Sequence, residues 1–171
     1  KNSIKQARHF CGKHLQFKVW DMRKTYHAGE FDVVFNLFSS FGYFDKEEED
    51  YKAVEAMHNE LKPGGTLVLD YINTEFAVKH MKGRTILQRG DVQFHISKKV
   101  EKGFIVKHIS FLTEKGDNQY TEYLKVINLA KFEDMFNRCG LQVKEIFGDY
   151  DLNPFVAATS PRLILVAQRN V

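Results

Sequence analysis

FDVVFNLFSSFGYF at residues 31–44 and LKPGGTLVLDYIN at residues 61–73 are the two stretches that decide the fold of this chain. Each contains a continuous apolar run of the kind found in strands that are covered on both faces of a parallel sheet. Each run ends in small, polar and aromatic residues. Because ligands bind at the carboxyl ends of the strands in open α/β sheets, we expect the functional site at this edge.

The residues between the two stretches predict a helix. From Tyr51 onward, the apolar positions Val54, Met57 and Leu61 recur at intervals of three and four, and the helix is expected to stop at the Pro-Gly-Gly of 63–65. A strand, a helix and a second strand with short links form a βαβ unit. The sequence therefore predicts an α/β fold with a parallel pair of strands.

The first thirty residues carry weaker signals. Ser3 to Cys11 has a helical pattern that Gly12 would end. QFKVWD at 16–21 alternates apolar and polar residues, which favours a strand that brings Asp21 to its carboxyl edge. Residues 24–30 are expected to form a polar loop.

The pattern changes at residue 84. Residues 92–100 alternate like a half-exposed strand, and the runs at 104–113 and 120–127 are also strand-like, with the loop KGDN at 115–118 between them. We therefore expect a small antiparallel β-meander inserted at 84–127. A second helix follows from Leu129 to Cys139, with Asn128 as its N-cap and Gly140 just past its end, and strands at 141–147 and 162–166 close the chain.

Composition limits the classes of function. A chain of 171 residues that is 43% hydrophobic can bury a core, so we expect a single domain over 1–171. The 25 basic and 22 acidic residues give a formal charge of +3 with no basic block, so nucleic acid is not indicated as a partner. No apolar run approaches the roughly 20 residues that span a bilayer, so no membrane partner is expected either.

Cysteine and histidine usage points to a cytoplasmic protein without a metal site. Cys11 and Cys139 lie far apart in helical patterns, where each is expected to be a buried free thiol. The seven histidines are scattered without the spacing of metal ligands.

The segments described above resemble the class I S-adenosylmethionine-dependent methyltransferases of the small-molecule type. FDVV is similar to the strand that ends beside the methyl donor, and LKPGGTLVLD is similar to the next strand. Leu129–Gly140, LQVKEIFGDY and SPRLILVAQ resemble the last helix and the final β-hairpin of that family. The resemblance implies a Rossmann-like methyltransferase sheet of strand order 3-2-1-4-5-7-6, with the 84–127 insertion as a substrate-side sheet.

One part of the family pattern is missing from this sequence. Family members begin with a strand that ends in an acid, a GxGxG-type loop, and a second strand that ends in an acid, whereas Gly12 here has no glycine neighbours. We therefore expect a fold that is truncated at its N-terminus, without the first βαβ part, as the remainder of a longer protein. A rearranged or intertwined assembly is the alternative.

The resemblance assigns residues to the cofactor, S-adenosylmethionine. Asp21 would accept a hydrogen bond from the adenine amino group, Met22 would pack on the ring, and Asn36, Leu37 and Phe38 would face the amino-acid and methyl end. Two simpler roles stay open. Asp21 could cap the next turn, and core packing explains Leu37 and Phe38 about as well.

Four further residues are expected at the methyl acceptor: Phe41, Tyr43, Tyr71 and Asn73. Aromatic faces attract cations such as sulfonium, so Phe41 and Tyr43 could line the transfer pocket. A helix N-cap explains Asn73 equally well. No catalytic residue is assigned, because in-line displacement needs alignment more than a dedicated acid or base.

The resemblance implies an enzyme that transfers a methyl group from S-adenosylmethionine to a small-molecule acceptor by in-line displacement. Two alternatives remain. One is a methyltransferase that acts on a macromolecule, and the other is a non-catalytic or truncated methyltransferase-like domain that cannot bind cofactor alone. A nicotinamide-binding domain is a distant alternative, because its GxGxxG motif is absent from the sequence.

Overall fold

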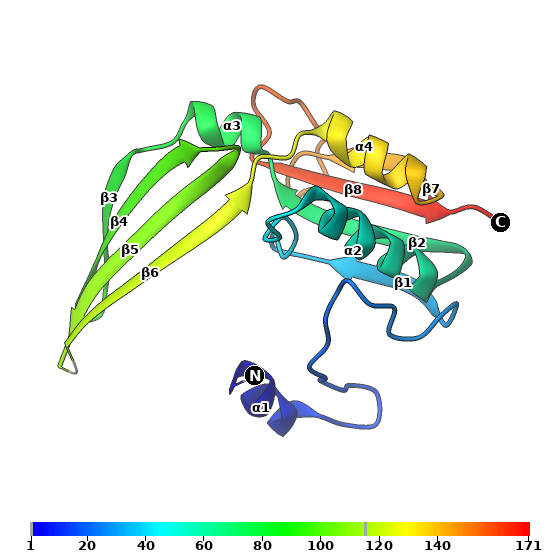
Figure 1. The fold of residues 1–171 in the computed structure, drawn as a ribbon, viewed down its shortest axis with the longest axis horizontal. Coiled ribbons are helices and arrows are strands. Elements are labelled where there is room, and N and C mark those ends of the chain that lie inside the picture. The colour runs from blue at the N-terminus through cyan, green and yellow to red at the C-terminus, as the bar shows by residue number, and fades with distance from the viewer. Residues whose placement is uncertain (1, 115) are drawn as a thin grey trace.

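The structure is a computed structural model that describes residues 2–114 and 116–171. It contains two four-stranded sheets, and the second sheet projects from the end of the first at which β2 (Leu61–Ile72) stops (Figure 1). Helix α3 (Thr74–Lys79) follows β2 at this junction. The two sheets therefore meet at the strand edge where the sequence predicts the functional site.

The first sheet is mixed. Its strand order is β1 (Phe31–Asn36), β2, β8 (Arg162–Arg169) and β7 (Leu141–Phe147). Strands β1 and β2 are parallel and are joined by α2 (Glu47–Glu60), whereas β8 is antiparallel to both β2 and β7. The predicted βαβ unit is confirmed, and the strand order corresponds to the 4-5-7-6 part of a Rossmann-like methyltransferase sheet.

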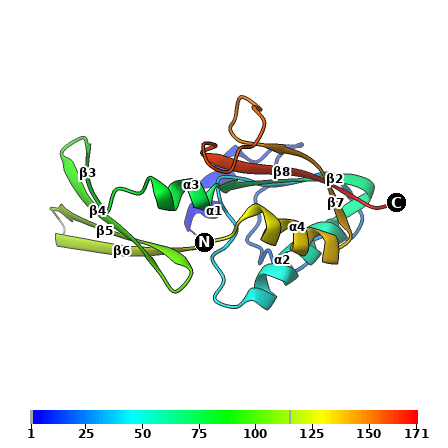
Figure 2. The ribbon, with the colours of Figure 1, turned by 90° about the horizontal axis from the view of Figure 1, so that it is seen from above.

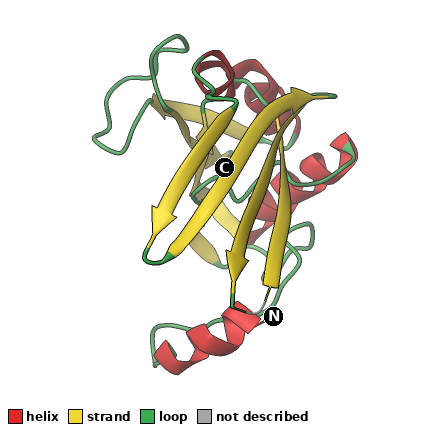
Figure 3. Ribbon diagram, turned by 90° about the vertical axis from the view of Figure 1, so that its left-hand side faces the viewer, coloured by secondary structure: helices red, strands yellow, loops and turns green. Residues whose placement is uncertain are grey.

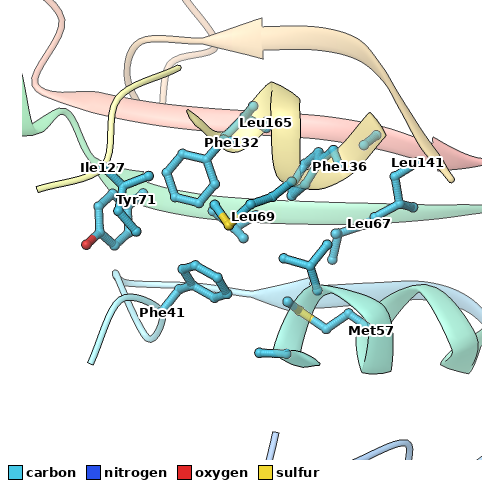
Figure 4. Close-up of a cluster of buried hydrophobic side chains, with 14 of the residues drawn as sticks. Phe41, Met57, Leu67, Leu69, Tyr71, Ile127, Phe132, Phe136, Leu141 and Leu165 are labelled. Atoms are coloured by element: carbon cyan, nitrogen blue, oxygen red, sulfur yellow. The ribbon is translucent and has the colours of Figure 1, made fainter. Parts of the chain in front are cut away.

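A layer of two helices covers one face of this sheet. Figure 2 shows α2 and α4 (Leu129–Arg138) on the same side of the strands. Asn128 caps α4 as predicted, because its Oδ1 accepts a hydrogen bond from the backbone N of Lys131 at 3.0 Å. Phe132 and Phe136 of α4 pack on the leucines of β2 in the core (Figure 4).

Strand β1 differs from its prediction as a strand covered on both faces. Val34 packs on the core, but Val33 is 42% exposed and Phe35 is 63% exposed. Among the described residues, β1 pairs with β2 alone. The apolar run that predicts a central strand therefore forms an open edge strand here.

The second sheet is an antiparallel meander of order β3-β4-β5-β6 (Figure 3). Its strands are β3 (Arg84–Arg89), β4 (Val92–Glu101), β5 (Phe104–Thr113) and β6 (Gly116–Lys125). Strands form at all three predicted positions, although the third spans Gly116–Lys125 rather than 120–127, and β3 is a fourth strand that the sequence does not predict. The predicted loop at 115–118 is wrong for Gly116–Asn118, which belong to β6, and Lys115 lies outside the described residues.

The amino-terminal part forms less structure than predicted. Helix α1 (Asn2–Ala7) continues into a single 3₁₀ turn, η1 (Arg8–Phe10), and neither buries a residue. The predicted strand at 16–21 does not form, because alternation alone cannot hold a strand without a partner for its backbone groups. Cys11 is exposed rather than buried, while Cys139 is half-buried; both thiols are free.

Candidate functional site

The loop that follows β1 has a constrained backbone. Phe38 and Ser39 have φ values of 58° and 55°, a left-handed conformation that side chains other than glycine seldom adopt. Two hydrogen bonds hold it there: the backbone N of Phe38 donates to Asp70 Oδ2 at 2.8 Å, and that of Ser39 donates to the Asp70 carbonyl at 3.0 Å. Such strain persists only where the surroundings fix it, and it is concentrated at functional sites.

Asp70 connects three distant segments at this edge. Its carboxylate is only 1% exposed and accepts hydrogen bonds from Arg162 Nε at 2.8 Å and from the Tyr150 hydroxyl at 3.0 Å. Arg162 Nη2 also donates to Ser39 Oγ at 3.2 Å. The buried charge is thus paired and fully hydrogen-bonded, which keeps the loop after β1 against the end of β2.

Two exposed aromatic rings stand at this edge. The Phe38 ring is 74% exposed, and its centroid lies 6.4 Å from that of Tyr150. The Arg162 guanidinium lies 5.6 Å from the Tyr150 centroid. Burial and the hydrogen bond to Asp70 raise the pKa of Tyr150 above its usual value, so the phenol stays neutral. The edge therefore offers uncharged aromatic faces that can attract a cationic group.

A cavity of about 570 Å³, which we call the β1-edge cavity, lies between β1 and residues 13–26. It brings together two of the predicted cofactor residues, Met22 and Asn36, with an apolar wall that includes Trp20 and Val34. Asn36 is only 6% exposed, and its Oδ1 accepts no hydrogen bond from any described residue. An unpaired buried acceptor beside an apolar wall suits a ligand with both a donor group and an apolar ring.

Asp21 does not line this cavity. Its carboxylate accepts hydrogen bonds from the backbone N of Arg23 at 3.1 Å and from the Arg23 side chain at 2.7 and 3.0 Å. These bonds lower the pKa of Asp21 from 3.8 to about 2. The turn-capping role considered for Asp21 is therefore present, and its contact with adenine stays a prediction. Leu37 and Phe38 also lie outside the lining of the cavity.

Phe41 and Tyr71 are core residues rather than pocket walls. Both are fully buried, and their ring centroids lie 5.7 and 5.2 Å from that of Phe132 (Figure 4). Tyr71 shares the helix-facing side of β2 with Leu67 and Leu69, because alternate residues of a strand face the same way. Neither ring can contact an acceptor in this structure, so their predicted placement at the acceptor is wrong.

Asn73 is a structural residue as well. Its Nδ2 donates to the carbonyls of Ala157 and Ser160, each at 2.8 Å, and its Oδ1 accepts from the backbone N of Phe76 at 3.5 Å. The side chain is buried and caps α3. The N-cap alternative is therefore confirmed, and the amide has no free donor for an acceptor molecule.

Tyr43 is the predicted acceptor residue that faces a cavity. A second cavity of about 550 Å³, which we call the α3 cavity, lies in the corner between α3, the loop after β1 and the antiparallel sheet. Tyr43 lines it with Phe76 of α3 and Leu124 of β6. Burial and the Glu122 carboxylate raise the pKa of Tyr43, so its hydroxyl stays protonated.

Hydrogen bonds of the backbone place Tyr43 beside this cavity. Gly42 precedes Tyr43, and its carbonyl accepts a hydrogen bond from the backbone N of Lys125 at 2.9 Å. The Tyr71 hydroxyl donates to the Lys125 carbonyl at 2.6 Å. Lys125 Nζ also pairs with the buried carboxylate of Asp50 in α2. The loop that carries Tyr43 is thereby tied to both sheets.

Arg162 and Tyr150 stand at this edge without having been predicted from the sequence. Arg162 pairs with Ile72 in the register between β2 and β8, so the antiparallel return of β8 brings its side chain to Asp70. If the antiparallel pairing of β8 with β2 had been predicted, it could have suggested that Arg162 lies near Asp70. No signal in the local sequence points to Tyr150.

Neither a metal site nor a membrane-spanning helix is found in the part of the chain that the structure describes. No three histidine, cysteine, aspartate or glutamate side chains come together there as they would to hold a metal ion. None of the helices described is long and apolar enough to cross a membrane.

Comparison with known sequences gives a curated relative of this chain. It is the dTDP-3-amino-3,4,6-trideoxy-alpha-D-glucopyranose N,N-dimethyltransferase of Streptomyces venezuelae, which is 26% identical over 136 residues. The match includes 75% of this chain and 57% of the relative, so the chain spans little more than half the length of that enzyme. No family model matches the chain.

Comparison with solved structures shows the fold. An S-adenosylmethionine-dependent methyltransferase from Clostridium acetobutylicum gives a TM-score of 0.83 at 14% identity, over 98% of this chain and 70% of that one. DesVI of Streptomyces venezuelae gives 0.71 at 21% identity, over 100% and 71% of the two chains. CalS10 of Micromonospora echinaspora, an amino pentose methyltransferase with S-adenosylmethionine bound, gives 0.71 at 20% identity, over 99% and 70%. The chain has the Rossmann-like fold of these proteins.

Proposed function

We propose that this chain, which resembles class I S-adenosylmethionine-dependent methyltransferases, forms the acceptor-side part of an enzyme that methylates a small molecule in the cytoplasm. One observation carries the proposal. A short, constrained loop runs from Asn36, in the β1-edge cavity, to Tyr43, in the α3 cavity. A donor in the first cavity and an acceptor in the second would meet across the carboxyl edge of the strands, where α/β folds bind their ligands.

The β1-edge cavity is the proposed cofactor side. Bound S-adenosylmethionine would supply an electrophilic methyl group: a lone pair of the acceptor would bond to the methyl carbon as the bond from carbon to sulfur breaks, and the neutral thioether S-adenosylhomocysteine would leave. The unpaired Oδ1 of Asn36 would accept a hydrogen bond from the ammonium group of the cofactor, and Met22 would pack on its adenine. The exposed ring of Phe38 would attract the sulfonium, and Leu37 would add an apolar contact beside it. Asp21 is the proposed partner of the adenine amino group.

The α3 cavity is the proposed acceptor side. The names of the relatives describe a dTDP-amino sugar N,N-dimethyltransferase and an amino pentose methyltransferase, which support the nitrogen of an amino sugar as the nucleophile. The oxygen of the Tyr43 hydroxyl can accept a hydrogen bond from an N–H of such an amine, which orients the nitrogen and leaves its lone pair free to attack. Alignment of the reacting atoms then supplies much of the rate.

The open edge of β1 supports an alternative, in which residues 1–171 are a methyltransferase-like domain that cannot bind cofactor alone. Val33 and Phe35 expose apolar surface on β1, which pairs on one side only within residues 2–114 and 116–171. Such an edge is a position at which a further strand can pair. A macromolecular acceptor has no comparable support.

Calorimetry with S-adenosylmethionine separates these readings. We would measure binding to residues 1–171 and to the full product of the gene, each as wild type and as Asn36→Ala. The proposal expects binding by the full product that Asn36→Ala weakens by about tenfold, because a buried acceptor loses its partner. A matched control, Asn118→Ala in β6, should leave the affinity unchanged. Binding by neither form would contradict the enzyme function.

A further inference from the structure

The α3 cavity carries an excess of positive charge. Lys82, Lys98 and Lys107 line it, against the single carboxylate of Glu122. Glu122 pairs with Lys107 at 3.0 Å, which neutralises that lysine. The side chains of Lys82 and Lys98 are exposed, and among the described residues they have no hydrogen-bond or ion-pair partner. Two cations therefore face the cavity without a counter-charge.

The strand register places two of these lysines side by side. Lys98 of β4 lies directly opposite Lys107 of β5, and like charges at such cross-strand positions destabilise a sheet. Lys107 in turn lies opposite Glu122 of β6, so the acid is positioned to neutralise Lys107 rather than Lys98. A bound anion would supply the charge that Lys98 lacks.

The rest of the lining is apolar. Ile72, Phe76, Ile105 and Leu124 come from β2, α3, β5 and β6 and enclose the cavity from several sides. A volume of about 550 Å³ is within the range of small-molecule sites, in which apolar walls hold the ligand body and a few polar groups orient it. Tyr43 stands at the same cavity, on the loop that leads back to β1.

We propose that the α3 cavity binds a ring-bearing small molecule that carries a phosphate or carboxylate group, with the anion held by Lys82 and Lys98 and the ring packed on the apolar walls. The assignment of the ring end near Tyr43 to methyl transfer rests on the proposed function. The anion site itself does not, because it follows from the charges and walls of the cavity.

Three naphthalene probes test the site on residues 1–171. The probes 1-naphthyl phosphate and 1-naphthoate share an apolar ring and differ in their anion, and 1-naphthol lacks the anion. We expect at least one anionic probe to bind about tenfold more tightly than 1-naphthol, with an advantage that decreases at high salt. The methyl NMR signals of Ile72, Ile105 and Leu124 should shift on binding. Comparison of the two anions shows which group the site prefers.

Lysine variants locate the anion. Lys98→Gln and Lys82→Gln should each weaken binding of the better anionic probe by about threefold or more and leave 1-naphthol unaffected. Lys99→Gln is the matched control, because Lys99 lies on the opposite face of β4 and pairs with Glu101 at 2.7 Å.

Three results would overturn the proposal: no binding by any probe, equal binding of 1-naphthol and both anions, or anion binding that Lys82→Gln and Lys98→Gln leave unchanged. No measurement in this series contains S-adenosylmethionine. A failure of the anion site is therefore distinct from a failure of methyl transfer.

Discussion

At the scale of single residues, the Asp70 carboxylate accepts hydrogen bonds from Phe38, Tyr150 and Arg162, which lie far apart in the sequence. Arg162 is the ionic partner of Asp70, and its side chain is largely buried with it. A buried pair of this kind adds little net stability over apolar packing, but removal of one partner leaves the other charge uncompensated. Asp70 therefore controls both the stability of this edge and the shape of the loop after β1.

Asp70→Asn should lower the free energy of unfolding by about 3–5 kcal/mol, because it leaves Arg162 buried without a counter-charge. Urea unfolding followed by circular dichroism measures the change. Asp151→Asn is the control, since the Asp151 side chain is exposed and should change stability by less than about 0.5 kcal/mol. Equal stability of the two variants would show that the Asp70 carboxylate does not hold this edge together.

A second prediction at this scale concerns the pH dependence of Asp21. Its pKa is lowered from 3.8 to about 2 by hydrogen bonds from Arg23, so the charged form is favoured in the folded state. The resulting stabilisation is fully present above pH 3.8 and is lost as the pH falls through about 2.

An NMR titration of the Asp21 carboxyl measures this pKa directly. Arg23→Gln should return it toward 3.8, while Arg138→Gln, which removes a bond to Asp134 instead, should leave it low. An unchanged Asp21 titration in Arg23→Gln would refute the assignment of the shift to Arg23.

At the scale of elements, the loop from β1 to α2 must pass closely over β2. A Cβ atom on Gly42 would lie 2.3 Å from the Tyr71 hydroxyl oxygen, so the approach requires glycine. Gly42 also has a φ of 80°, as does Gly103, but a Cβ on Gly103 would meet nothing within 4 Å. Alanine at either glycine would strain the backbone, but only alanine at Gly42 would also clash with Tyr71. Comparison of the two substitutions therefore distinguishes the destabilisation due to backbone strain from the destabilisation due to the clash.

Gly42→Ala should destabilise the protein by about 1–3 kcal/mol more than Gly103→Ala, because only the first change forces the Tyr71 hydroxyl away from Lys125. Thermal or urea unfolding of both variants gives the comparison. Equal losses would mean that the close approach of the loop to Tyr71 does not matter to the fold.

Phe35 in β1 and Phe41 in the loop that follows have opposite environments. Phe41 is fully buried in the core, whereas Phe35 lies on the open face of β1. Phe41→Ala should cost about 3–5 kcal/mol of unfolding free energy, and Phe35→Ala in the same chain should cost less than about 1 kcal/mol. A large loss for Phe35→Ala would show that this face of β1 is covered in residues 1–171 in solution.

At the scale of the whole molecule, much of the fold could be predicted from hydrophobic period. The continuous runs around Val34 and Leu67 identified β1 and β2, and the period of α4 and its Asn128 cap were clear. The strand at 16–21 failed because alternation cannot show whether a neighbouring strand is present to pair with it. Strand β3 was not predicted, because Arg84–Arg89 is exposed along its whole length. A strand without a buried face does not require alternating apolar and polar residues, which are the signal used to predict strands.

The candidate site was predicted less well than the fold. Asn36 and Tyr43 line cavities beside the predicted strand edge, and their roles at this edge stay predictions. Tyr71 was misplaced, although its alternation with Leu69 on β2 already indicates the core face. The contact between Asp70 and Arg162 could not be read locally, since it depends on the antiparallel pairing of β8 with β2 across 92 positions in the sequence.

Transfer of a tritium-labelled methyl group from S-adenosylmethionine, by the full product of the gene, tests the central claim most directly. The acceptor would be an amino sugar linked to dTDP, with the corresponding hydroxy sugar as its control. The account predicts labelled amino sugar as the product and a lower rate for Tyr43→Ala. Label that appears only in protein or nucleic acid, or no transfer to the amino sugar, would contradict it.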